Sequence, residues 1–133
     1  MLTGCGGPDP SDEAVRSSEV REAIESNGVV VDIDVLDNSF RPVDVTIEVG
    51  TRVTFTNVGR NEHNILPDSI ANDGELTRAL AEASNPDVWG VASTDLPPGA
   101  SYSHEFLAPG VYNFYCSIHG VPGKGMYGIL TVT

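Results

Sequence analysis

The sequence predicts an all-β protein: a Greek-key β-sandwich with one short helix in an insertion and a flexible N-terminal tether. From residue 29 onwards, several short segments alternate apolar and polar residues. The chain of 133 residues also carries 14 Gly and 9 Pro, which supply turns between such segments. Within this part of the chain, only one stretch has helical spacing. Short alternating strands separated by turn signals are typical of two packed sheets, each with one buried face.

The chain divides into two parts. Residues 1–28 are an N-terminal linker, and residues 29–133 form the folded domain. Residues 4–12 are mostly Gly, Pro, Asp and Ser, a composition typical of a solvated tether. Residues 11–26 have sparse, loosely periodic apolar positions, so this stretch is either a short helix or disordered linker.

The expected strands follow from a period of two. The first three carry alternating apolar side chains at Val31, Ile33 and Val35, then at Val45, Ile47 and Val49, then at Val53 and Phe55. Gly50 and Thr51 predict a tight hairpin between the second and the third strand. Further strands are expected near residues 63–66, 101–107, 111–116 and 127–132.

One helix is expected between these strands, over Glu75 to Ser84. Leu76, Ala79, Leu80 and Ala83 would share one face. Asp73 is a plausible N-cap. Trp89 is expected to pack close by.

The charge balance limits the choice of partners. A formal net charge of −12 argues against binding to nucleic acid and to an anionic membrane surface, and favours a partner with a basic docking face. Six carboxylates are opposed only by Arg78 between residues 68 and 95; they are Asp68, Asp73, Glu75, Glu82, Asp87 and Asp95. They form either a solvated face or a docking patch.

The N-terminal cysteine suggests a location. Leu2-Thr3-Gly4-Cys5 resembles the lipobox of bacterial and archaeal lipoproteins, in which the cysteine sulfur carries lipid. We therefore expect a lipid anchor on Cys5, after a signal segment in the precursor, and an extracytoplasmic protein. A chance match and a disulfide between Cys5 and Cys116 are the alternatives. No stretch approaches the roughly 20 apolar residues of a membrane-spanning helix.

The richest chemistry lies near the C-terminus. Cys116, His119 and Met126 fall within eleven residues, and His63 lies far upstream. Two imidazoles, a thiolate and a weakly bound thioether are the ligand set of a blue-copper electron-transfer site. If the strands alternate, Cys116 and Met126 both face the interior. His104 shares the inward parity of its strand but lies outside this set, so we interpret it as structural.

Three pieces of the chain, in order, resemble the cupredoxin family of type 1 blue-copper proteins, most closely its plastocyanin and halocyanin members. They are Phe40-Arg41-Pro42 with the strands after it, His63-Asn64-Ile65, and Tyr115-Cys116-Ser117-Ile118-His119 with Gly125-Met126. The resemblance covers about residues 29–133. Two features depart from the plastocyanin pattern: a longer segment between His119 and Met126, and Ile118 where many relatives have Pro.

This resemblance implies one copper ion on His63, Cys116, His119 and Met126. Asn64 would tie the two ligand-bearing segments together. The edge of His119 would be the electron port, framed by Val121 and Pro122. Tyr115 would be a second, longer route.

The expected function is one-electron transfer between extracytoplasmic redox partners, such as a basic cytochrome or a membrane oxidoreductase complex, by a monomer that is not an enzyme. All four copper positions are filled, which leaves none open for a substrate. The alternative is a copper module for storage, delivery or sensing, although such proteins usually have Met-rich or multi-Cys sites and this chain has two Met and two Cys. A fragment of a copper oxidase or nitrite reductase would need more histidines than these three.

Overall fold

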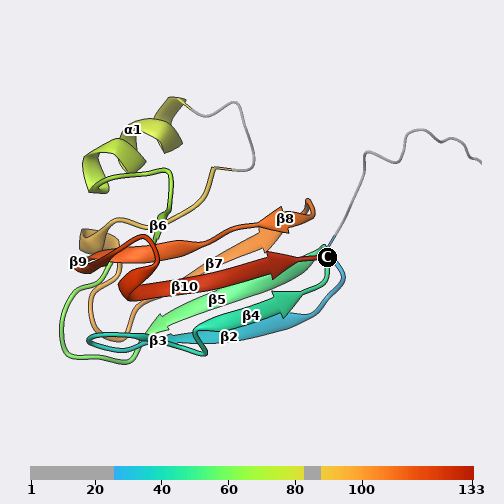
Figure 1. Ribbon diagram of the computed structural model, residues 1–133, viewed down its shortest axis with the longest axis horizontal. Coiled ribbons are helices and arrows are strands. Elements are labelled where there is room, and N and C mark those ends of the chain that lie inside the picture. Colours follow the sequence, from blue (N-terminus) through green and yellow to red (C-terminus); the bar gives the residue numbers. More distant parts are fainter. Residues whose placement is uncertain (1–25, 83–87) are drawn as a thin grey trace, which may run out of the picture.

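Two facing sheets make up the domain in the computed structural model, which describes residues 26–82 and 88–133 (Figure 1). In one sheet the strand order is β3 (Phe40–Arg41), β2 (Val30–Val35), β5 (Thr51–Asn57) and β7 (Ser101–Phe106). In the other it is β4 (Asp44–Ile47), β10 (Lys124–Val132), β9 (Phe114–Val121) and β6 (Leu66–Pro67), with β8 (Gly110–Val111) also paired to β10. The predicted all-β sandwich is confirmed.

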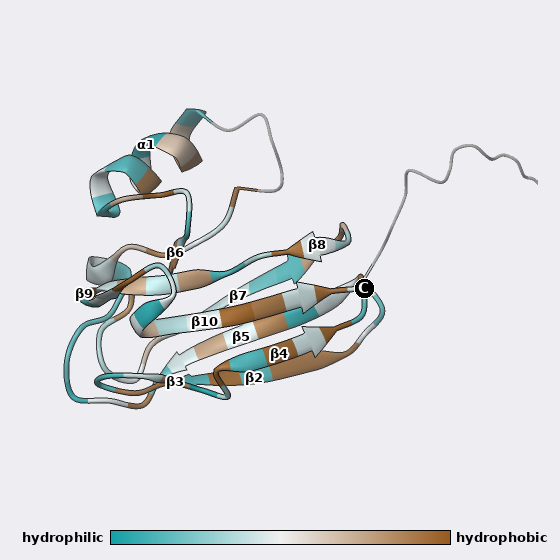
Figure 2. Ribbon diagram, viewed as in Figure 1, coloured by the Kyte–Doolittle hydropathy of each residue, from teal (hydrophilic) through white to brown (hydrophobic). Residues whose placement is uncertain are grey.

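The core lies between the sheets and is built from the inward positions of the alternating strands. Ile33, Val35, Val53 and Phe55 have no exposed surface. Figure 2 shows the same alternation as hydrophobic and hydrophilic segments along the strands. The ring of Phe114 lies 5.3 Å from that of Phe55, edge to face, and joins the two sheets.

The hairpin predicted at Gly50 and Thr51 is wrong. β4 pairs in parallel with β10, whereas β5 pairs with β2 and β7, so the turn carries the chain from one sheet to the other. Gly50 adopts a φ of 93°, and its N–H donates to the carbonyl of Phe106 at 2.7 Å. Alternation shows which face of a strand is buried, but not which strand lies beside it.

The helix is confirmed, with a corrected start. α1 (Asp73–Glu82) lies outside the sandwich beyond β6 and β9 (Figure 1). Asn72 is the cap: its Oδ1 accepts from the N–H of Glu75 at 2.8 Å, while Glu75 Oε1 accepts from the N–H of Ala71. Leu76 is buried and Leu80 is exposed. Ala83 and Ser84 lie outside the described residues, and a 3-10 turn, η1 (Ser93–Asp95), precedes β7.

The predicted strand near 63–66 is reduced to Leu66–Pro67 and a single bridge from Ile65 to Val91. At the C-terminus the strands are longer than expected. β9 and β10 run through the segment between Cys116 and Met126 and leave only Pro122 and Gly123 between them. The longer loop is therefore a β-hairpin.

Residues 1–25 lie outside the described residues, and with them Cys5 and most of the stretch 11–26 for which a short helix was one alternative. Asn27 shows where the chain enters the sandwich, because its N–H donates to the carbonyl of Gly50, next to the start of β5. Within residues 26–82 and 88–133, no helix is long and apolar enough to cross a membrane.

Candidate metal centre

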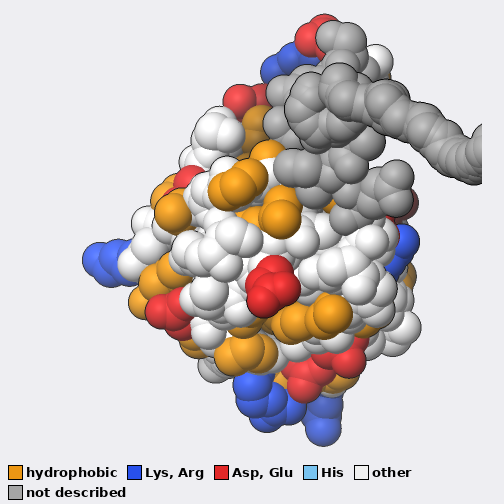
Figure 3. Space-filling model, turned by 90° about the vertical axis from the view of Figure 1, so that its right-hand side faces the viewer, with side chains coloured by type: hydrophobic (Ala, Val, Ile, Leu, Met, Phe, Trp, Pro, Cys, Tyr) orange, Lys and Arg blue, Asp and Glu red, His pale blue; other side chains and the backbone are white. Residues whose placement is uncertain are grey.

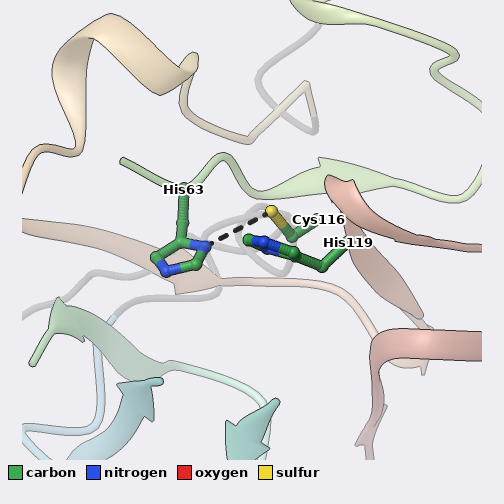
Figure 4. A group of neighbouring side chains, drawn as sticks. All are labelled: His63, Cys116 and His119. Atoms are coloured by element: carbon green, nitrogen blue, oxygen red, sulfur yellow. Dashed lines mark hydrogen bonds between the residues drawn. The ribbon is translucent and has the colours of Figure 1, made fainter. Parts of the chain in front are cut away.

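Three potential ligands meet at one end of the sandwich. Candidate donor atoms of His63, Cys116 and His119 all lie within 4.8 Å of one another (Figure 4). Nδ1 of His63 is 3.7 Å from Sγ of Cys116, and the two imidazole rings are 5.5 Å apart between centroids. His63 and Cys116 are fully buried, whereas His119 is exposed. The cluster thus has two enclosed donors and one donor at the surface.

A bulge in the β9–β10 hairpin places two of these ligands. Tyr115 pairs with Tyr127 and Gly120 pairs with Gly125, so residues 116–119 stand opposite Met126 alone. Such an unequal pairing bends one strand and redirects its side chains. Cys116 and His119 occupy the two ends of this bulge, and Met126, opposite them, is fully buried.

Two glycines allow the strands to approach closely here. A Cβ on Gly120 would lie 2.4 Å from the backbone nitrogen of Met126. A Cβ on Gly125, whose φ is 79°, would lie 2.8 Å from the carbonyl oxygen of His119. Any side chain at either position would push the bulge and Met126 apart.

Asn64 links the two ligand-bearing segments. Its Oδ1 accepts from the N–H of Ser117 at 2.9 Å, and its Nδ2 donates to Ser117 Oγ at 2.9 Å and to Asp73 Oδ1 at 2.8 Å. The other oxygen of Asp73 accepts from the N–H and the hydroxyl of Ser93. The first residue of α1 is therefore part of the frame around the ligands, which its sequence position did not reveal.

Asp37, in the turn after β2, is a further neighbour that the sequence did not indicate. Its Oδ1 lies 3.2 Å from Nε2 of His63 and accepts from the N–H groups of Arg60 at 2.8 Å and Asn61 at 3.1 Å. Hydrogen bonds from the Arg60 amide, first, and from His63 hold the pKa of the Asp37 carboxyl below its ordinary value. No local pattern links residues 37 and 63.

The other predicted site residues fall into two groups. Val121 and Pro122 are exposed in the hairpin that carries His119, and Ile118 beside it is 47% exposed. Tyr115 is only 4% exposed, packs with Leu66 and Leu76, and donates its hydroxyl to the carbonyl of Ile70. Burial, followed by the carboxylates of Asp68 and Glu75, raises the pKa of Tyr115.

His104 and Trp89, which the sequence also singled out, lie outside the ligand cluster. His104 stacks on Trp89, with ring centroids 6.0 Å apart, and meets Phe106 edge to face. Trp89 belongs to the main core and is 4% exposed. Cys5 lies outside the described residues, and Cys116 is a free, buried thiol.

The donor set fits copper. Thiolate and thioether sulfur suit the reduced ion, and imidazole nitrogen suits both of its oxidation states. His63 supplies an imidazole nitrogen and Cys116 a sulfur, both from buried positions, and the buried Met126 lies opposite the same bulge. Cys116 is a free thiol, and a role as a copper ligand would explain why it is buried beside the imidazole of His63.

Comparisons with known proteins point to a copper-binding family. The family model described as "Copper binding proteins, plastocyanin/azurin family" matches residues 27–133. The plastocyanin of Dryopteris crassirhizoma is 34% identical over 93 residues, which cover 70% of this chain and 86% of that protein.

Solved structures give the same fold. A purple cupredoxin from Nitrosopumilus maritimus is 25% identical with a TM-score of 0.54, and the match covers 77% of this chain and 99% of that one. A copper-containing nitrite reductase from Thermus scotoductus is 25% identical with a TM-score of 0.56, and the match covers 79% of this chain but 22% of that one. This chain therefore belongs to the plastocyanin/azurin family of copper-binding proteins, and the cluster of His63, Cys116 and His119 is its candidate copper site.

Proposed function

We propose that the protein is a one-electron carrier with a single type 1 copper site. The observation that carries this proposal is the asymmetry of the ligand cluster, in which His63 and Cys116 are sealed in the core and only His119 reaches the surface. A sealed thiolate is protected from solvent and from oxidation. One exposed imidazole leaves a single short route between the site and a partner.

The proposed ligands are His63 through Nδ1, Cys116 through Sγ, His119 and Met126. Copper held by these donors supplies reversible one-electron oxidation and reduction. The chain contributes a frame around these donors: Asn64 ties Ser117 to the segment of His63, and Gly120 and Gly125 leave room for Met126 to lie close to the bulge. A frame that moves little between oxidation states favours rapid electron exchange.

The surface around His119 supports its use as the electron port. Ile118 is 47% exposed and Val121 is 54% exposed, and Pro122 follows at the hairpin tip. Apolar side chains around a donor atom allow close, short-lived contact with a partner. Tyr115 offers a weaker second route, because the side chains packed over it leave only 4% of its surface exposed.

A carrier is favoured over an enzyme and over a storage protein. The match to the nitrite reductase covers only 22% of that protein's chain, so the shared fold alone does not carry its activity over to this chain. In the described ranges, residues 26–82 and 88–133, only one group of His, Cys and carboxylate side chains is arranged to hold a metal. Two Met and two Cys in the chain are too few for the soft, sulfur-rich sites of storage modules.

Placement outside the cytoplasm on a lipid at Cys5 is also part of the proposal. Asn27 enters the sandwich beside the start of β5, whereas His63 follows the end of that strand, so this entry point and the proposed copper site lie at opposite ends of the sandwich. Figure 3 views the molecule from the right-hand side of Figure 1, and no histidine is visible on the part of this face that the grey residues leave uncovered. An anchored protein could therefore present His119 away from the membrane.

The test is a potentiometric titration of the copper-loaded protein, followed by stopped-flow reduction by a basic cytochrome across ionic strength. We expect one reversible electron per copper and rates that fall as salt rises, because the net charge is −12. Tight copper binding without reversible one-electron cycling would favour the storage module. Rates that do not change with salt would contradict a basic partner but would be compatible with an electron carrier.

A further inference from the structure

We propose that Asp37 positions His63 as a copper ligand and lowers the reduction potential of the site. The inference rests on the proposed function, since it takes His63 to be a ligand. Asp37 lies outside every motif that identifies the copper site. Its Oδ1 is 3.2 Å from Nε2 of His63, while Nδ1 of the same ring faces Sγ of Cys116 at 3.7 Å. The two ring nitrogens therefore have different partners on opposite sides.

The partners determine which nitrogen carries the proton. A neutral imidazole has one N–H donor and one acceptor nitrogen, and an ionised carboxylate only accepts. Nε2 of His63 must therefore donate to Asp37, which leaves the lone pair of Nδ1 directed toward Cys116. The ring is fully buried, so water cannot easily replace the carboxylate. Without Asp37 the buried N–H would lose its acceptor.

The carboxylate is itself held in place. The amides of Arg60 and Asn61 donate to the same Oδ1, and both belong to the turn that leads into His63. A Cβ on Gly59 would lie 2.2 Å from that oxygen, so the absence of a side chain at 59 leaves room for it. The contact is therefore built by the turn, not made by a freely rotating surface group.

The charge of Asp37 gives the contact a redox consequence. A negative group hydrogen-bonded to a ligand makes the imidazole a stronger donor and favours the more positive oxidation state of the metal. The Asp37 side chain is 38% exposed, so solvent weakens the effect without removing it. Loss of outer partners of this kind typically costs 10–100-fold in metal affinity. Because Asp37 is partly exposed, we expect an effect at the low end of this range. The ratio of the affinities for copper(II) and copper(I) should change about tenfold.

Two variants separate charge from position. Asp37→Asn keeps an acceptor oxygen but removes the charge, and Gly59→Ala keeps the charge but displaces the carboxylate. Both should raise the reduction potential of the copper-loaded protein, with Asp37→Asn raising it by about 59 mV for a tenfold change in a one-electron couple. The matched control is Asp34→Asn, which removes an equally exposed carboxylate paired with Arg41. Potentials of both variants equal to that of the control would overturn the redox role.

The positioning role has a test that needs no copper. Nitrogen NMR of the metal-free wild type, at a pH well above the ordinary histidine pKa, reports which ring nitrogen of His63 is protonated. We expect the Nε2–H tautomer, with a proton that exchanges slowly in the wild type and faster in Gly59→Ala. A wild type with the proton on Nδ1 would overturn the positioning role. Because this measurement involves neither metal nor partner, its failure is distinct from failure of electron transfer.

Discussion

The proposed ligands differ in what each would contribute, and Met126 shows this most clearly. It stands alone opposite the four-residue bulge of residues 116–119 and is fully buried. A thioether bonds copper weakly in sites of this kind. Met126 should therefore tune the site more than build it.

Met126→Leu tests this directly. The variant should keep copper and its colour. Its reduction potential should rise, because loss of a donor favours the reduced ion. A tenfold change in the ratio of the affinities for the two oxidation states corresponds to about 59 mV. Met126→Gln, the matched polar variant, should lower the potential. Potentiometric titration with visible detection measures both. A spectrum and a potential unchanged by Met126→Leu would mean that the longer hairpin holds this residue away from the metal.

Helix α1 is joined to the site by its first residue. Asp73 accepts one hydrogen bond from Asn64 and two from Ser93, and Asn64 in turn holds Ser117 beside Cys116. The helix therefore braces the ligand loop from outside the sandwich. Asp73 is one of the six carboxylates that could form a docking patch, but both of its oxygens already accept hydrogen bonds within the protein.

Asp73→Ala should loosen this brace. We expect the free energy of unfolding of the copper-loaded protein to fall by about 1–3 kcal/mol, because the donors of the buried Asn64 and the half-buried Ser93 lose their acceptor. Urea titration measures the loss. Glu82→Ala, at the far end of the same helix and exposed, is the control and should change it little. Equal effects of the two variants would show that Asp73 acts only through helix stability or net charge.

Features that repeat along the chain were predictable from sequence, and features that join distant segments were not. Alternation identified the buried faces of Ile33, Val35, Val53 and Phe55, because burial of one face follows the strand period. The hairpin at Gly50 was wrong because alternation does not encode neighbours across the sandwich. The contact of Asp37 with His63, 26 residues apart, arises only when two turns meet in the fold.

The proposed function assigns different roles to the two ends of the molecule. His119 and the exposed Val121 lie in the ligand-bearing hairpin, whereas Val111 of β8 pairs with Thr131 close to the C-terminus. Val121 is 54% exposed and Val111 is 65% exposed, so the pair is matched in type and exposure but not in position.

This pair tests the electron port. Val121→Asp should slow electron exchange with a basic cytochrome several-fold, because a hydrated carboxylate prevents close approach to His119. Val111→Asp adds the same charge at the other end and should leave the rate near that of the wild type. Stopped-flow rates at several ionic strengths separate loss of contact from a change in long-range attraction. Similar rates for Val121→Asp and wild type would place the port elsewhere.

The tether predicts where the molecule is found. Expressed from its native gene, the protein should be lipidated on Cys5 and recovered with membranes, since lipoprotein modification supplies the two or more acyl chains that stable anchoring requires. Cys5→Ser should release a protein with the same copper spectrum. Fractionation and mass spectrometry of the N-terminal peptide measure this. A wild-type protein recovered in the soluble fraction with an unmodified Cys5 would rule the anchor out.

The central claim is that Cys116 binds copper as a thiolate at one end of the sandwich. The most direct measurement is a copper titration of wild type and Cys116→Ser, followed by visible absorption and checked by circular dichroism for the fold. One equivalent of copper should give the wild type an intense thiolate-to-copper band, which Cys116→Ser should lack while keeping its β-sandwich. An intense band in Cys116→Ser, or a folded wild type that binds one copper without colour, would contradict the account.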